Sequence, residues 1–166
     1  MRRLLDLPLR AMSERAPATR PAPDLIAAWD VPDLAREVLA AHGPPIDVAF
    51  QADLQTSVEP ELESAGRHFY RLGRWGRVWI VGAEAGTSQV TCLNVEHGNA
   101  PEAVFNSALP PFVMGIWRWS RVNEVIDMND VAMYDALDLF AHEQRRLDPV
   151  AAASDLFGWD AVVEAY

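Results

Sequence analysis

The chain has 166 residues, half of them apolar, which is enough for one domain with a buried core. Its formal net charge is −10, and all 14 of its Lys and Arg residues are arginine. A surface this acidic repels phosphate backbones and anionic headgroups, so the charge argues against direct binding of nucleic acid or of membranes.

Cysteine content and the first residues indicate the compartment. Cys92 is the single cysteine, which excludes an intramolecular disulfide and a thiolate-rich zinc site. The leucines near the start are interrupted by Asp6, Pro8 and Arg10 and make no signal-peptide core. The chain also has no uninterrupted apolar stretch of about 18 residues, the minimum for crossing a bilayer. We therefore expect a soluble, cytoplasmic protein.

The first 23 residues differ in composition from the rest. Residues 13–23 combine three prolines with small and charged side chains that bury little apolar surface. This composition predicts a flexible leader over residues 1–23, followed by a single domain over residues 24–166.

A helix is predicted next. Pro32 suits its first turn, Leu34, Val38 and Leu39 recur at helical spacing, and Gly43 followed by two prolines ends it. Between residues 46 and 95 the apolar residues instead form short extended runs. Glycines at 73–76 and 82–86 stand at hairpin spacing between those runs, which favours an antiparallel meander.

Helical periodicity returns after residue 107. Asn106 or Ser107 is available to cap a helix whose buried face consists of Leu109, Phe112, Val113, Ile116 and Trp119. A second helix is expected after Asp130 as its cap, with a buried stripe made of Met133, Tyr134, Leu137 and Phe140. A short last helix is expected over residues 159–166. The order predicts an α+β fold: a mainly antiparallel central sheet flanked by an N-terminal helix and C-terminal helices.

Four segments of the chain resemble the SUKH superfamily of bacterial immunity proteins, and its fourth subfamily most. The residues that carry the resemblance are 39–45, 68–73, 104–109 followed by Phe112, and the late Trp159. The resemblance implies a SUKH-like α+β fold. It also implies a role in neutralising a toxin domain, commonly a nuclease or a nucleic-acid deaminase, although some members of the superfamily are regulators that bind proteins outside toxin systems.

Three patterns suggest chemistry, and each has a simpler interpretation. Cys92 and His97 fall on opposite faces of an extended strand, so they do not form a nucleophile or a metal site unless a turn intervenes. The glycine turn at 82–88 lacks the lysine of a phosphate loop. Arginines and aromatic residues alternate over 67–79, as in single-strand binders, but also as in any amphipathic strand. We predict no catalytic residue, no metal site and no cofactor.

Acidic residues and one tryptophan are the predicted partner-binding residues. A nuclease or deaminase presents a basic substrate groove, which a negative surface reaches quickly and can cover. Trp75 stands at a predicted turn, where partial exposure would let it anchor a partner. The predicted partner-binding residues are Asp47, Asp53, Glu59, Glu61, Glu63 and Trp75.

Three functions remain open from the sequence. The first is a bacterial immunity protein that binds a cognate toxin domain of a polymorphic toxin system and acts as a monomer or weak dimer. The second is a regulatory or scaffold module that binds proteins but no toxin. The third is an enzyme or small-ligand binder, which requires a deep pocket lined by Cys92, His97 or converging carboxylates.

Overall fold

The computed structural model describes residues 5–14, 16–46, 50–125, 132–154 and 157–164. The helices are α2 (Leu9–Ser13), α3 (Pro23–Ala28), α4 (Asp33–Ala41), α5 (Leu109–Val125), α6 (Ala132–Leu147), α7 (Pro149–Ala152) and α8 (Gly158–Glu164). The strands are β1 (Phe50–Ala52), β2 (Leu62–Ser64), β3 (Arg67–Trp75), β4 (Trp79–Glu84), β5 (Val90–Asn94) and β6 (Ala100–Asn106).

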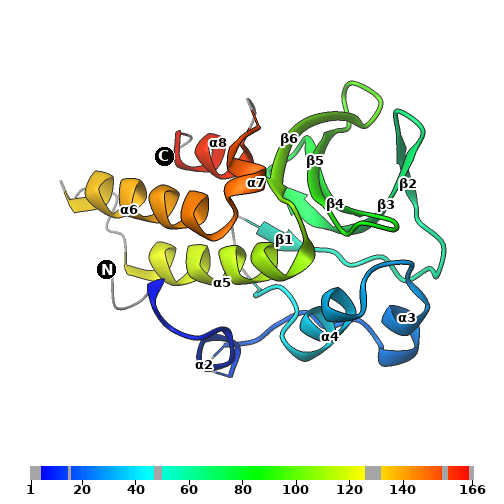
Figure 1. Cartoon of the computed structure of the whole chain (residues 1–166), viewed down its shortest axis with the longest axis horizontal. Coiled ribbons are helices and arrows are strands. Elements are labelled where there is room, and N and C mark those ends of the chain that lie inside the picture. The colour runs from blue at the N-terminus through cyan, green and yellow to red at the C-terminus, as the bar shows by residue number, and fades with distance from the viewer. Residues whose placement is uncertain (1–4, 15, 47–49, 126–131, 155–156, 165–166) are drawn as a thin grey trace.

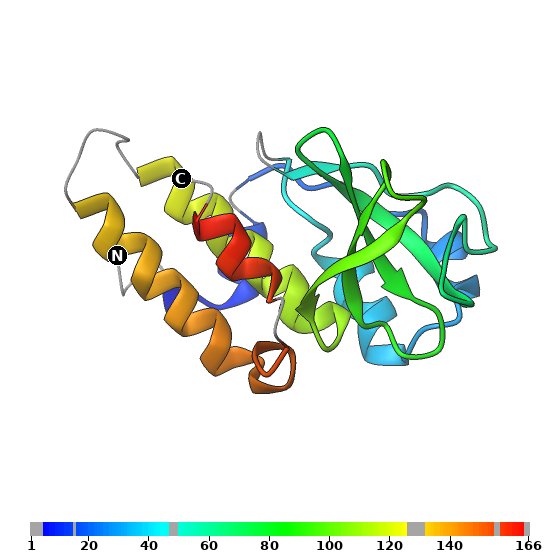
Figure 2. The same ribbon diagram turned by 90° about the horizontal axis from the view of Figure 1, so that it is seen from above.

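Within the described residues, one six-stranded antiparallel sheet stands between the early and late helices in the chain. Its strands follow the order β1-β3-β4-β5-β6. Strand β2 pairs with the same edge of β3 as β1, but with the beginning of that strand, whereas β1 pairs with its end. The sheet occupies one end of the molecule, whereas α6 lies at the other end, as both views show (Figures 1 and 2). The predicted α+β arrangement is therefore confirmed.

Two glycines predicted to stand between strands lie within them instead. Gly73 is inside β3 at a register shift, where an added Cβ would come within 2.5 Å of the Phe50 ring and 2.6 Å of the Gln51 carbonyl. Gly82 is inside β4. The turns themselves use Gly76 and Gly86, both with positive φ, which glycine adopts at no steric cost. Gly73 thus serves the close approach of β1 rather than a turn.

The main core fills the space between the sheet and the helices. Trp159 of α8 contacts the rings of Trp75, Phe105, Phe112 and Phe140, with centroids 5.1 to 6.2 Å apart. Each such pair contributes about 0.5–1.5 kcal/mol beyond the burial of its area. A smaller cluster covers the opposite face of the sheet, because side chains alternate along a strand; it consists of Leu62, Phe69, Ile80 and Leu93.

The helix predicted before the sheet is confirmed as α4. The helix ends at the position predicted from Gly43 and the two prolines after it. Gly43 has φ +56°, and its amide donates a hydrogen bond of 2.9 Å to the Leu39 carbonyl, which closes the last turn. The Gly43 carbonyl in turn accepts a hydrogen bond of 2.8 Å from the Trp117 indole. The turn after α4 is therefore attached to the middle of α5.

Within the predicted leader, residues 5–14 and 16–23 pack against the rest of the protein. Leu5 and Met12 are buried in the main core. Residues 17–19 pair with the chain after α4, since Thr19 donates to the Pro44 carbonyl and Ile46 to that of Pro17. The prolines therefore shape an extended segment that binds through its backbone.

The late helices agree with the predicted periodicity apart from two details. All five residues predicted for the buried face of α5 are at most 1% exposed. In α6, Met133, Leu137 and Phe140 are buried as predicted, but Tyr134 is 65% exposed. Asp130, the predicted cap of α6, lies outside the described residues.

Candidate partner-binding surface

Most of the predicted partner-binding residues fall on one segment, residues 53–63, which we call the acidic loop. Asp53 follows β1, Glu59 and Glu61 lie in the connection to β2, and Glu63 lies within β2. Asp47 lies outside the described residues. The structure therefore brings four of the predicted carboxylates onto the same edge of the sheet.

A buried glutamine determines the shape of the acidic loop. Gln55 is 0% exposed, and its side-chain amide donates to the Ser57 carbonyl, the Ser57 hydroxyl and the Glu59 carbonyl. Its side-chain carbonyl accepts from the Glu61 and Arg71 amides, the latter over 2.9 Å. Because these bonds connect the loop to itself and to β3, the loop is held in one conformation.

Arg71 of β3 lies between two of the loop's carboxylates. Its terminal nitrogens are 3.3 Å from Asp53 and 3.3 Å from Glu61. Glu61 also accepts a hydrogen bond from the Ser57 hydroxyl over 2.9 Å. The positions of Asp53 and Glu61 are therefore set before any partner arrives, and part of their negative charge is already neutralised.

Glu59 and Glu63 are the more available carboxylates of the acidic loop. Both are exposed, and neither forms an ion pair with a described residue. Arg74, at 4.0 Å from Asp53, is the second arginine that pairs with the loop. The loop's four carboxylates thus outnumber the two guanidiniums paired with them.

The expectation that Trp75 is partly exposed is wrong. Its side chain is 8% exposed and belongs to the main core, where its ring lies 6.1 Å from that of Phe50 and 6.0 Å from that of Trp119. Trp75 is the last residue of β3, and the inward face of the strand continues up to the turn. It therefore has little surface to offer a partner.

The aromatic residues of β3 are buried on both faces of the strand, so the arginines and the aromatic rings do not separate onto a solvent face and a core face as expected for an amphipathic strand. Phe69 and Tyr70 are at most 3% exposed, and the Tyr70 ring stacks on Trp29 at 4.5 Å. The Arg67 guanidinium lies 5.3 Å from the centre of the Phe69 ring and 3.7 Å from Glu84. These rings are engaged inside the protein and leave no stacking platform for bases.

A second acidic surface, outside the predicted partner-binding residues, lies on α6 and α8. Tyr134, Asp135 and Asp138 are exposed on α6. A shallow groove beside them includes Asp160 and Glu164 of α8, and Asp160 is paired with Arg145 over 2.7 Å. The spacing of Tyr134 and Asp138, one helical turn apart, is the signal that identifies this face. The face lies at the opposite end of the molecule from β2 (Figures 1 and 2).

Three of the residues that carry the family resemblance, Asn106, Ser107 and Trp159, belong to one hydrogen-bond network inside the protein that includes the carboxylate of Asp148. Asp148 is 3% exposed and accepts from the Ser107 amide at 2.6 Å, the Ser107 hydroxyl at 3.0 Å and the Asn106 side chain at 3.2 Å. Asn106 in turn accepts from the Trp159 indole at 2.9 Å. The Asn106 side chain, one of the two predicted caps of α5, thus joins β6 to α8.

The residues considered for chemistry are separated in the structure. Cys92 is buried in β5, whereas His97 is exposed in the turn that follows. In the part of the chain that the structure describes, no three His, Cys, Asp or Glu side chains are placed to hold a metal ion. The helices described are also too short or too polar to span a bilayer.

Comparison with known proteins gives one match. A model of the SUKH-4 immunity protein family matches residues 10–165. No curated protein matches the chain, and neither does any solved structure. The family match covers nearly the whole sequence and includes all four segments that suggested it, so this chain belongs to the SUKH-4 immunity protein family.

Proposed function

We propose that this chain is the immunity protein of a bacterial polymorphic toxin system, and that it binds and neutralises a cognate toxin domain with nuclease or nucleic-acid deaminase activity. Membership of the SUKH-4 immunity protein family is the observation that carries the proposal. In this proposal the protein acts in the cytoplasm, as a monomer or weak dimer, by covering the toxin's active site and not by catalysis.

The acidic loop is the surface proposed to meet the toxin. Glu59 and Glu63 supply exposed negative charge, while Arg71 and Gln55 hold the rest of the loop in place. A preorganised loop loses little conformational entropy on binding, and its charge steers a basic groove toward it. A basic group of the toxin can also replace Arg71 as the partner of Asp53 or Glu61.

The test is co-expression with the toxin encoded next to this gene. The wild-type protein should protect cells from the toxin, and the purified proteins should form a complex. A Glu59→Gln/Glu63→Gln variant should associate about two- to tenfold more slowly at low salt, with the difference shrinking as salt is added. Asp135→Asn/Asp138→Asn removes the same charge from α6 and is the matched control.

The possible outcomes separate the function from the surface. If the toxin is neither bound nor neutralised, the proposed function is refuted; capture of a partner that is not a toxin would instead support a regulatory module. If the toxin is neutralised but only the α6 variant slows association, the function stands and the acidic loop is the wrong surface. Gln55→Leu should weaken binding as well, because it releases the loop.

A further inference from the structure

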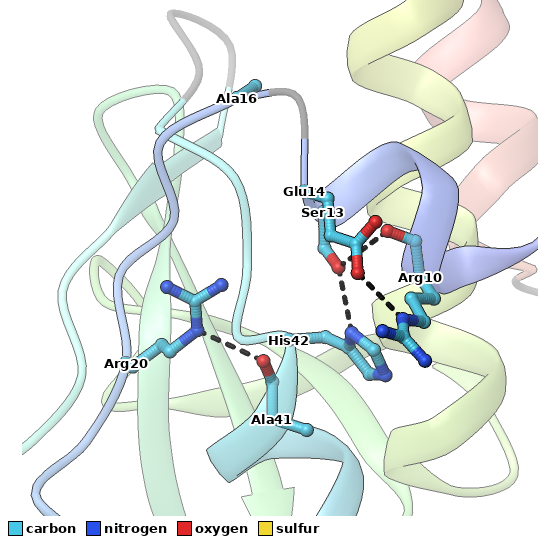
Figure 3. A pocket seen from close by; sticks show the side chains of 7 residues that line it. All are labelled: Arg10, Ser13, Glu14, Ala16, Arg20, Ala41 and His42. Atoms are coloured by element: carbon cyan, nitrogen blue, oxygen red, sulfur yellow. Dashed lines mark hydrogen bonds and ion pairs between the residues drawn. The ribbon is translucent and has the colours of Figure 1, made fainter.

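A polar pocket of about 570 Å³ opens between the N-terminal segment and the end of α4. Figure 3 shows how its side chains lie: α2 and the residue after it form one wall, residues 16–20 another, and the end of α4 the floor. The lining residues are Arg10, Ser13, Glu14, Ala16, Arg20, Ala41 and His42. The proposed toxin-binding surface uses none of them.

A hydrogen bond across the pocket holds the N-terminal segment against α4. The Ser13 hydroxyl lies 2.8 Å from Nδ1 of His42, and Ser13 is only 4% exposed. Arg121 of α5 adds a bond of 3.3 Å to the Met12 carbonyl. The wall formed by α2 is therefore anchored to two other helices, and the pocket is part of the folded structure.

The two arginines of the pocket are oriented by bonds through Nε. Arg20 donates from Nε to the Ala41 carbonyl over 3.0 Å, and its two terminal amino groups point away from Ala41, into the open space between residues 16–20 and α2 (Figure 3). Arg10 donates from Nε to Glu14 over 2.6 Å. A guanidinium fixed in this way still presents terminal N–H donors that match the spacing of oxygens on an anion.

Among the described residues that line the pocket, positive charge exceeds negative charge, although the protein carries a net charge of −10. Two guanidiniums, those of Arg10 and Arg20, stand against one carboxylate, that of Glu14. Burial lowers the pKa of His42, and the positive charges of Arg20 and Arg10 lower it further, against an opposing effect of Glu14. The field that disfavours a proton on His42 is the same field that favours a bound anion.

We propose that this pocket binds the phosphate group of a small phosphorylated ligand. A phosphate dianion gains more than a carboxylate from the positive charge of Arg20 and Arg10, and Arg20 can bind two of its oxygens at once. The volume exceeds what a phosphate alone requires and lies in the usual range of small-molecule sites, so an organic group can accompany it. Neither the family match nor the proposed immunity function assigns a ligand to this site.

The test is a titration with inorganic phosphate, followed through the imidazole NMR signals at constant ionic strength. The chain has four histidines, at 42, 68, 97 and 142, so three of them are internal references. Phosphate should shift the His42 signals saturably and raise the pKa of His42, because the anion offsets the two guanidiniums. The other three histidines should respond only weakly. Acetate and a simple phosphate ester are compared in parallel.

Three variants test the geometry. Arg20→Met should weaken phosphate binding at least roughly tenfold, while Arg77→Met, an exposed arginine in the turn after β3, should not. Glu14→Gln should tighten binding, because it releases Arg10 from its carboxylate. A gain of affinity cannot result from misfolding, which keeps the test valid even if Arg20→Met unfolds the segment.

The proposal is refuted if phosphate produces no saturable shift at His42, or if Arg20→Met and Glu14→Gln leave the affinity unchanged. Binding of acetate as tightly as phosphate would also refute it. Tighter binding of the phosphate ester than of inorganic phosphate would support an organic ligand, whereas equal binding would limit the site to the phosphate ion and so contradict the organic part of the proposal.

Discussion

Removing the Asp148 carboxylate should destabilise the protein strongly, although the residue takes no part in the proposed binding. Two of its acceptor bonds go to backbone amides, those of Ser107 and Ala151, which have lengths of 2.6 and 3.1 Å. In Asp148→Ala these amides and the Asn106 side chain lose their acceptor in a site that is 3% exposed. A buried donor left without a partner costs about 1–3 kcal/mol.

The summed effect of Asp148→Ala is about 3–5 kcal/mol of unfolding free energy, allowing for some access of water. For a chain of this length the melting temperature should fall by about 6–20 °C. Asp148→Asn should lose less, about 1–3 kcal/mol. Its one remaining oxygen can face Ser107 and Asn106, but its amino group then meets the donating amide of Ala151.

Thermal and urea denaturation followed by circular dichroism measure both losses. Asp138→Ala is the matched control, because Asp138 is exposed in the middle of α6 and its loss should change stability by less than about 0.5 kcal/mol. A double-mutant cycle with Asn106→Ala should give a coupling energy of at least about 0.5 kcal/mol. The reasoning fails if Asp148→Ala and Asp138→Ala have the same melting temperature.

Two further predictions concern packing and pH. Gly115→Ala should lower the unfolding free energy by about 1–3 kcal/mol, because the added Cβ would lie 2.6 Å from the Trp159 ring and 2.7 Å from the Gln144 side chain. This overlap should outweigh the higher helix propensity of alanine. A melting temperature at or above that of the wild type would contradict the overlap. Because the pKa of His42 is lowered in the folded state by burial and then by Arg20 and Arg10, the unfolded chain takes up this proton first as the pH falls. The stability that depends on neutral His42 is thus complete above the ordinary histidine pKa of about 6.5 and is lost as the pH falls toward the folded value. His42→Gln should reduce the loss of unfolding free energy as the pH falls below that value. The unfolding free energy is measured by urea denaturation at several pH values; if it depends on pH equally in the variant and the wild type, His42 is not the group responsible.

The sequence predicted the fold well where one periodicity governed a whole element. The buried face of α5 follows from helical spacing, and Gly43 marks the end of α4 because no other residue adopts its backbone conformation as easily. Gly73 and Gly82 misled the prediction because glycine serves turns and close packing alike. Only the position of β1 against β3 shows that Gly73 serves the second role.

The candidate surface was predicted in composition but not in detail. The charge pattern of the sequence identifies the carboxylates of the acidic loop. Their ion pairs with Arg71 depend on how β3 aligns with its neighbouring strands, and that alignment could not be predicted from the sequence. Gln55 gave no signal, because a glutamine in a loop is ordinarily exposed. The position of Trp75 near a turn predicts an exposed side chain, but the aromatic core extends to the end of β3 and encloses the Trp75 ring.

The family resemblance reports the scaffold and not the interface, for a physical reason. Asn106, Ser107 and Trp159 are recognisable because they meet Asp148 in a buried network in which each substitution leaves a polar group unsatisfied. Exposed carboxylates such as Glu59 have no such constraint, since surface substitutions change stability little. The buried network therefore restricts the scaffold more strongly than the exposed surface. Substitutions at Asp148 should accordingly reduce the amount of folded protein and leave the affinity of each folded molecule for the proposed toxin unchanged. Substitutions at Glu59 should lower that affinity and leave the amount of folded protein unchanged.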